Sequence, residues 1–205
     1  MNDMFEQTVQ TEHWRLRLIP MEAPALAETV LGGTVSVASD GELTLHTGAM
    51  YGPVDAAFDV LDGLPGDPAA EWEDVVELSV NATGSEPIAL IGIFDDNVDV
   101  DGSGSSGPSL ESGKCYRARV HVRGRDDSDA DELIEIGQPA KDHFLIQLWP
   151  APASDPEVLK LGSFKAHSDY ENSDFFSRSH FVINGMGDPD LEELKAQNLR
   201  NAGER

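Results

Sequence analysis

Two clusters of acidic residues are the parts of this sequence best suited to chemistry, and the first follows a strongly apolar segment. Asn97, Asp99 and Asp101, followed by Gly102, have the residue types and alternate spacing with which a calcium-binding loop begins, because Ca²⁺ binds carboxylate and amide oxygens. Such a loop ends in a bidentate glutamate, but its twelfth position here is Pro108. We therefore expect a solvated acidic loop, with calcium binding by Asn97, Asp99 and Asp101 as an alternative.

The second cluster lies in the segment 125–135. Its acids are Asp126, Asp127, Asp129, Asp131, Glu132 and Glu135, and the first cluster contributes Asp95, Asp96, Asp99 and Asp101. Together they could form an anionic surface that meets a lysine-rich partner, with Trp149 as an apolar contact. The alternative is a hairpin loop that the charges keep solvated. The clusters adjoin opposite ends of one expected strand, about 30 Å apart at the rise of a strand, so they need not form a single patch.

Catalytic chemistry finds little support in the sequence. The six histidines show no HxxxH or HExxH spacing for zinc. The glycines of residues 102–107 fit G-x-G-x-x-G, but the aspartates before them would repel phosphate and a strand is expected after them. The run His167-Ser168-Asp169 holds the residue types of a catalytic triad, which is defined by positions in space rather than by adjacency. We expect a non-enzyme without a cofactor. The alternative is an enzyme with His121 or His143 beside carboxylates in a cleft.

Net charge restricts the partners. The formal charge is −24 at pH 7, which repels nucleic acid and anionic membrane surfaces and attracts cations or basic proteins. High solubility is the simpler explanation of such a charge. Cys115 is the only cysteine, so an intrachain disulfide is excluded and a reducing compartment is favoured. No apolar segment of a secretory signal is visible near residue 1, and the cytoplasm is the expected location.

A basic stripe accompanies the second acidic cluster. Its members alternate along one expected strand and just beyond it: Arg117, Arg119, His121, Arg123 and Arg125. Because side chains alternate across a strand, these residues share one face and Tyr116, Ala118, Val120 and Val122 share the other. We expect the basic face to pair with carboxylates such as Glu73 and Glu77 on a neighbouring strand. An anion-binding site is the alternative.

The elements that must position these residues are short strands separated by turns. Alternating or continuous apolar runs predict strands over residues 12–19, 34–38, 42–47, 54–61, 72–81, 87–94, 115–123 and 144–149, with a further edge strand over 158–164. Residues 25–31 are expected to form a helical turn, and 166–184 are ambiguous.

The absence of a βαβ rhythm predicts a mainly β protein, folded as an antiparallel, jelly-roll-like β-sandwich. We expect one domain over residues 1–187. A short C-terminal helix or tail is expected over residues 188–205, since Asp188 can cap a helix that has Pro189 at its first position.

Three strand motifs carry a resemblance. The runs WEDVVELS (Trp72–Ser79), YRARVHVRGRD (Tyr116–Asp126) and FLIQLWPAP (Phe144–Pro152) resemble an actinobacterial family that has no assigned activity. More faintly, the layout of strands resembles the competence-protein-J type inhibitor of a DNA-entry nuclease. The second resemblance implies a binding protein, and no inhibitor residue carries over. This chain departs from both in its acidic Gly/Ser segment, 95–113, and in its tail from Asp155.

These observations together predict an acidic protein that binds and neutralises a basic protein, as an inhibitor or immunity protein of a nuclease or toxin. Association would be steered by the acidic loops. A calcium-dependent binding module and an enzyme of unknown chemistry in a jelly-roll cleft are the alternatives.

Overall fold

The computed structural model describes residues 4–24, 29–93, 107–131, 133–135 and 137–172. Most of the regular structure in these ranges is β-strand, as expected. In chain order the elements are β1 (Phe5–Glu12), β2 (Arg15–Glu22), β3 (Thr29–Leu31), β4 (Val35–Val37), β5 (Glu42–His46), β6 (Tyr51–Val60), β7 (Asp74–Ala82), β8 (Ala89–Gly92), β9 (Cys115–Arg123), α1 (Arg125–Asp129), β10 (Asp142–Pro150), β11 (Glu157–Lys160) and α2 (Phe164–Glu171).

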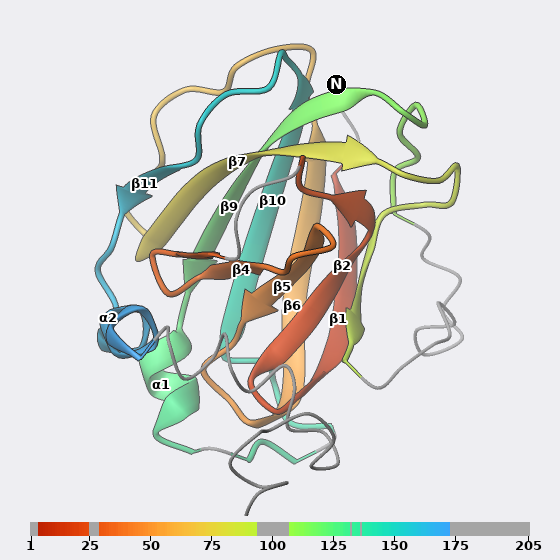
Figure 1. Cartoon of the computed structure of the whole chain (residues 1–205). Coiled ribbons are helices and arrows are strands. Elements are labelled where there is room, and N and C mark those ends of the chain that lie inside the picture. The colour runs from red at the N-terminus through yellow and green to blue at the C-terminus, as the bar shows by residue number, and fades with distance from the viewer. Residues whose placement is uncertain (1–3, 25–28, 94–106, 132, 136, 173–205) are drawn as a thin grey trace, which may run out of the picture.

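Six strands close into a barrel around the core (Figure 1). Their order is β7, β9, β10, β6, β1 and β2, and a short ladder between β2 and β7 completes the ring, with Met21 opposite Ala82. Neighbours pair antiparallel except β6 and β10, which run parallel. The mainly β class is confirmed. The finer expectation of an antiparallel sandwich is corrected, because the strands form one closed ring that includes a parallel pair.

The pairing of β2 explains why the sequence pointed to a sandwich. Along its eight residues β2 pairs with β1, β5, β8 and β7. Alternation along a strand shows which of its faces is buried, but a sandwich and a barrel require the same alternation. A barrel differs from a sandwich in which strand edges pair with one another, and closing the barrel leaves fewer strand edges unpaired.

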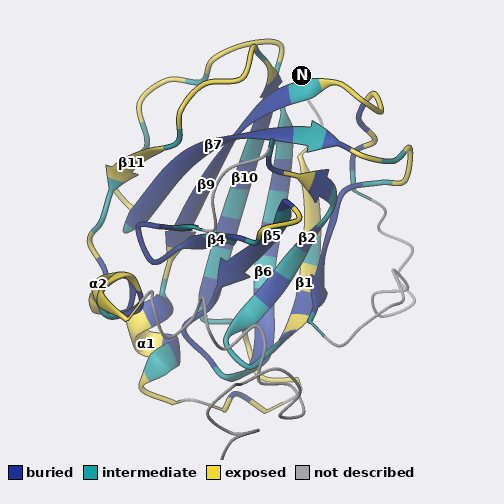
Figure 2. Cartoon of the chain, in the orientation of Figure 1, coloured by how far each residue is buried: buried dark blue, intermediate teal, exposed yellow. Residues whose placement is uncertain are grey.

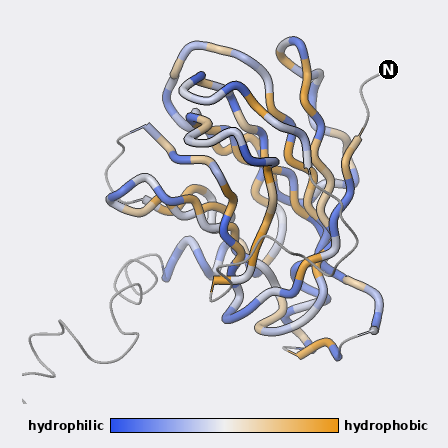
Figure 3. The backbone as a smooth tube through the Cα atoms, turned by 90° about the vertical axis from the view of Figure 1, so that its right-hand side faces the viewer, coloured by the Kyte–Doolittle hydropathy of each residue, from blue (hydrophilic) through white to orange (hydrophobic). Residues whose placement is uncertain are grey.

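The core fills the inside of this barrel. The side chains expected to point inward do so on β9 (Tyr116, Ala118, Val120, Val122) and on β10 (Phe144, Ile146, Leu148). Figure 2 shows β7 and β9 largely buried and the outer turns and parts of both helices exposed, and Figure 3 shows hydrophobic and hydrophilic stretches alternating along the backbone.

The β1–β2 hairpin corrects the expected strand at residues 12–19. His13 and Trp14 form a two-residue turn with φ of 50° and 62°, the backbone geometry that suits tight hairpins. Neither residue is the glycine or asparagine that usually marks such a turn. β1 shows no apolar alternation in the sequence, because only Val9 and Thr11 are buried among its polar residues.

Other corrections concern the connections. Residues 125–135 begin with the helix α1 rather than forming a hairpin loop, and the last part of 25–31 is the strand β3. The edge strand expected near Val158 is confirmed as β11, which ends the sheet beside β7. The ambiguous segment contains most of α2. The expected helix at 188–205 and the boundary at residue 187 lie outside the described residues. None of the helices in the described ranges has the length and apolarity that crossing a membrane requires.

Candidate functional site

The expected basic stripe lies mostly inside the protein. Arg117 and Arg119 are each 5% exposed, and both reach Glu77 of β7. Arg117 Nη2 lies 3.3 Å from Glu77 Oε2, and Arg119 Nε donates to Glu77 Oε1 at 2.5 Å. Cross-strand pairing with Glu77 is therefore confirmed. Glu73, the other expected partner, instead accepts a hydrogen bond from the backbone N–H of Gly124 at 2.9 Å.

Neighbouring loops cover these arginines, and Trp149 is buried with them. Arg117 donates to the carbonyl oxygens of residues 154 and 155, and Arg119 to the carbonyl oxygen of Gly66. Trp149 is 4% exposed, and the guanidinium of Arg119 lies 5.8 Å from its ring centre. The ring therefore does not offer the exposed docking contact expected of it.

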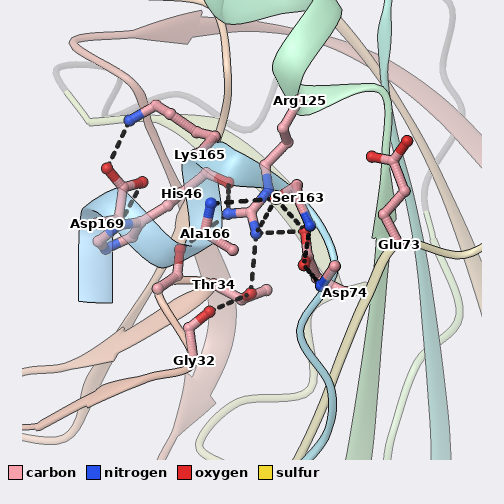
Figure 4. Close-up of polar contacts among 12 residues, drawn as sticks. Gly32, Thr34, His46, Glu73, Asp74, Arg125, Ser163, Lys165, Ala166 and Asp169 are labelled. Carbon is pink, nitrogen blue, oxygen red and sulfur yellow. Dashed lines mark hydrogen bonds and ion pairs between the residues drawn. The ribbon is translucent and has the colours of Figure 1, made fainter. Parts of the chain in front are cut away.

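Arg125 continues the stripe into the interior and is fully buried (Figure 4). Its Nη2 donates to Asp74 Oδ2 at 2.6 Å and to Thr34 Oγ1 at 3.1 Å, and its Nη1 donates to the carbonyl oxygen of Gly33 at 2.8 Å. Asp74 also accepts from the hydroxyl of Ser163 at 2.6 Å. A buried charge requires such partners, since desolvation otherwise makes it very costly.

The Arg125 contacts join parts of the chain that are distant in sequence. They link α1, the β3–β4 turn, the start of β7 and the N-cap of α2. Burial opposes ionisation of Asp74, but the charge of Arg125 and the hydrogen bonds from Ser163 outweigh it and hold the pKa of Asp74 below its ordinary value. The close approach of the turn to α2 requires glycine, because a Cβ on Gly33 (φ +57°) would lie 2.0 Å from the carbonyl oxygen of Ala166.

The second acidic cluster is divided between structural and exposed roles. Asp126 accepts hydrogen bonds from the first two backbone N–H groups of α2, at 2.9 and 2.8 Å. Asp131 pairs with Lys141 at 2.6 Å. Asp127 is exposed, and Asp129 is half-buried.

The remaining candidates cannot be placed in the same way. Glu132 and the whole first cluster (Asp95, Asp96, Asn97, Asp99 and Asp101) lie outside the described residues. Whether the two clusters form one surface, and whether the first binds calcium, therefore stay predictions.

A polar cavity of about 400 Å³ opens beside α1. Its lining consists of Glu71, Glu73, Arg123, Gly124, Asp127, Lys141 and His143. The cations in this lining are already in contact with other groups: Lys141 with Asp131, and the Arg123 guanidinium with the ring of Trp72, 5.6 Å from its centre.

Histidine in the cavity wall adds little positive charge. Burial and the nearby Arg123 lower the pKa of His143, and Asp55 acts in the opposite direction. His143 Nδ1 lies 3.8 Å from Asp55 Oδ2. We call the exposed carboxylates Glu71, Asp127 and Asp131 around this cavity the α1 surface. Within the described ranges, no three His, Cys, Asp or Glu side chains are grouped so that they could hold a metal ion.

A second group, which sequence reasoning missed, lies near the Arg125 contacts. Ser36 Oγ of β4 lies 2.5 Å from Nε2 of His46, at the end of β5. His46 Nδ1 lies 3.6 Å from Asp169 Oδ2 of α2, and Lys165 Nζ donates to Asp169 Oδ1 at 2.6 Å. His46 and Asp169 are each 2% exposed and Ser36 is half-buried. Asp169 belongs to the His-Ser-Asp run of the sequence, but its partners come from elsewhere.

Comparisons with known proteins give shape alone. No protein-family model matches the chain, and neither does any curated protein. The chain is similar to a solved structure titled "Crocagin biosynthetic gene J", at 12% identity and a TM-score of 0.43, over 74% of this chain and 99% of that one. It is also similar to ComJ of Bacillus subtilis, an inhibitor of the DNA-degrading activity of NucA, at 11% identity and a TM-score of 0.46, with the same coverage.

The faint likeness to the competence-protein-J type inhibitor is thus found in the structure as well as in the layout of strands. At this identity no residue role follows from it. The resemblance to the actinobacterial family stays a prediction.

Proposed function

We propose that this chain is an acidic binding protein that neutralises a basic protein partner, as an inhibitor or immunity protein of a nuclease or toxin. A protein that binds nucleic acid presents basic groups to the phosphate backbone. A rigid anionic surface can compete for those groups.

The observation that carries this proposal is the inward placement of the cations. Four basic residues are at most 8% exposed: Arg117, Arg119, Arg125 and Lys165. Each contacts a carboxylate of the same chain, namely Glu77, Asp74 or Asp169. These positive charges nearly cancel against the carboxylates buried with them, so they are not available to an approaching partner, and the excess of negative charge behind the net charge of −24 belongs to the rest of the chain.

The α1 surface is the part of the described exterior best placed to meet a basic group. Glu71 and Asp127 are exposed at the rim of a cavity whose cations are already in contact with Asp131 and Trp72. Exposed carboxylates of this kind accelerate encounter with a basic surface and contribute less to the strength of the final complex.

The test begins with capture of partners by the full chain from extracts of its own cells, identified by mass spectrometry. The association rate constant with the captured protein is then measured from about 20 mM to about 200 mM salt, where screening changes most. We expect a basic partner and a fall of at least about 10-fold in that rate constant.

Two double variants show which part of the surface accelerates association. Glu71→Gln/Asp127→Asn should slow association more than Glu6→Gln/Glu86→Gln, which also removes two exposed carboxylates. The control pair lies toward the other end of the barrel, since Glu6 pairs with Ala57 and Glu86 lies in the connection that follows the far end of β7. A salt-independent rate constant, or a captured partner that is itself acidic, would overturn the proposal. Equal slowing by the two pairs would leave general steering but remove the α1 surface as its site.

A further inference from the structure

Ser36, His46 and Asp169 come from three elements and meet outside the barrel core. Ser36 pairs with Thr44 in the β4–β5 ladder, and His46 follows two residues later on the same face, while Val35 and Leu45 point into the core. Asp169 approaches from α2, which the Arg125 contacts and the capping by Asp126 hold in place.

The order of the contacts is compatible with the protonation that this group needs for nucleophilic chemistry. When Ser36 Oγ donates to Nε2, that nitrogen carries no proton, and the imidazole proton lies on Nδ1 facing Asp169. This is the arrangement of a serine nucleophile, a histidine base and a carboxylate that orients the base. The 3.6 Å separation of Nδ1 and Oδ2 is longer than a hydrogen bond, and such contacts often tighten only when substrate is bound.

Charge at the site agrees with these roles. Burial lowers the pKa of His46 despite the nearby Asp169, so the imidazole is neutral and able to accept a proton at pH 7. Burial opposes ionisation of Asp169, but His46 and Lys165 outweigh it and lower the pKa of that carboxyl. Arg15 is the ladder partner of His46 and is close enough to influence it electrostatically.

From this geometry we propose that Ser36, His46 and Asp169 form an acyl-transfer site at which the protein hydrolyses carboxylic esters. Ser36 Oγ attacks the acyl carbon while its proton passes to His46 Nε2. His46 then protonates the departing alkoxide and leaves an acyl-serine. Water, deprotonated by the same nitrogen, then attacks the acyl carbon. The bond from that carbon to Ser36 Oγ breaks, His46 returns the proton to Oγ, and the acid is released. One ester and one water give one acid and one alcohol, with no change of oxidation state.

The test uses the full chain with a fluorophosphonate probe, which phosphonylates an activated serine hydroxyl and releases hydrogen fluoride. We expect one added probe mass, located on the peptide that contains Ser36, and turnover of p-nitrophenyl acetate. Ser36→Ala should abolish the labelling. His46→Gln should reduce both labelling and turnover by at least about 100-fold, the usual size of a general-base contribution.

Controls separate chemistry from folding. Ser39→Ala changes an exposed serine in the β4–β5 turn and should label like the wild type. Melting curves of Ser36→Ala and His46→Gln show whether each variant is folded, and covalent labelling is a readout that a merely structural hydrogen bond would not produce. An unlabelled wild type, or labelling that persists in a folded Ser36→Ala variant, would overturn the proposal. Binding of a basic partner is independent of this result.

Discussion

Two buried charged residues near α1 differ in how their charges are compensated. Arg125 is fully buried and reaches the Asp74 carboxylate together with several oxygens, so its charge is matched. Asp142 is also fully buried, but the contacts to its Oδ2 are the backbone N–H groups of Gly48 and Ala49, and its Oδ1 accepts no hydrogen bond. Burial raises the pKa of Asp142 to about 6, although those N–H groups, the nearby Ser128 hydroxyl and the charge of Arg125 all act to lower it.

The raised pKa of Asp142 predicts a stability that depends on pH. Its folded-state pKa lies above the unfolded value, so the folded protein holds the extra proton, and the free energy of unfolding falls as pH rises from about 4 to about 6. Asp142→Asn removes that penalty and should be more stable than the wild type by about 2–3 kcal/mol at pH 7, with little difference at pH 4. Urea unfolding at both pH values measures this.

Asp127→Asn is the matched control for that prediction, since it removes the same charge from an exposed position in α1. Its stability should follow that of the wild type at both pH values. A difference between wild type and Asp142→Asn that is the same at pH 4 and pH 7 would contradict the assignment to Asp142.

At the scale of elements, α1 and α2 are held together by polar contacts rather than by a shared apolar face. The carboxylate of Asp126 in α1 accepts from two backbone N–H groups of α2, and the Ser163 N-cap accepts from the N–H of Ala166 at 3.0 Å. The first N–H groups of a helix have no partners within it, so these bonds satisfy the beginning of α2.

Removing the carboxylate at Asp126 should therefore loosen α2. Asp126→Ala is expected to lower the free energy of unfolding by about 1 kcal/mol, the usual cost of losing a helix cap. Asp127→Ala, one residue later, removes an exposed carboxylate that caps no helix, and should stay within about 0.5 kcal/mol of the wild type. Chemical denaturation of the three proteins measures both values. Equal destabilisation by the two variants would assign the effect to net charge instead.

At the scale of the whole molecule, the barrel separates charge by depth. Its strands carry paired arginines and carboxylates between the core and the covering loops, and exposed carboxylates remain outside. This arrangement displays negative charge on a rigid scaffold, which is the basis of the proposed binding function.

The first acidic cluster, which includes Asp99 and Asp101, allows a test of whether the negative charge of this protein serves to bind metal. We expect calorimetric titration of the full chain with Ca²⁺ to show no heat beyond that of Mg²⁺, because Pro108 stands where the bidentate glutamate of a calcium loop belongs. The melting temperature should change equally with the two ions. Saturable heat with Ca²⁺ alone that disappears in Asp99→Asn/Asp101→Asn would establish the calcium alternative.

The sequence by itself determined the strands with strong alternation, their buried faces, and the pairing of the Arg119 region with Glu77. Alternation is a local property that survives whichever neighbour a strand receives. It also fixed the net charge and the absence of an intrachain disulfide.

Only the tertiary structure decided the closure of β2 against β7, the parallel β6–β10 pair and the burial of Arg125 and Trp149. It also brought Ser36, His46 and Asp169 together, across more than a hundred residues of sequence. These features depend on which distant segments meet. Local sequence does not indicate which distant segments will pair. A polar residue has the same identity in the sequence whether its side chain faces water or contacts a partner inside the fold.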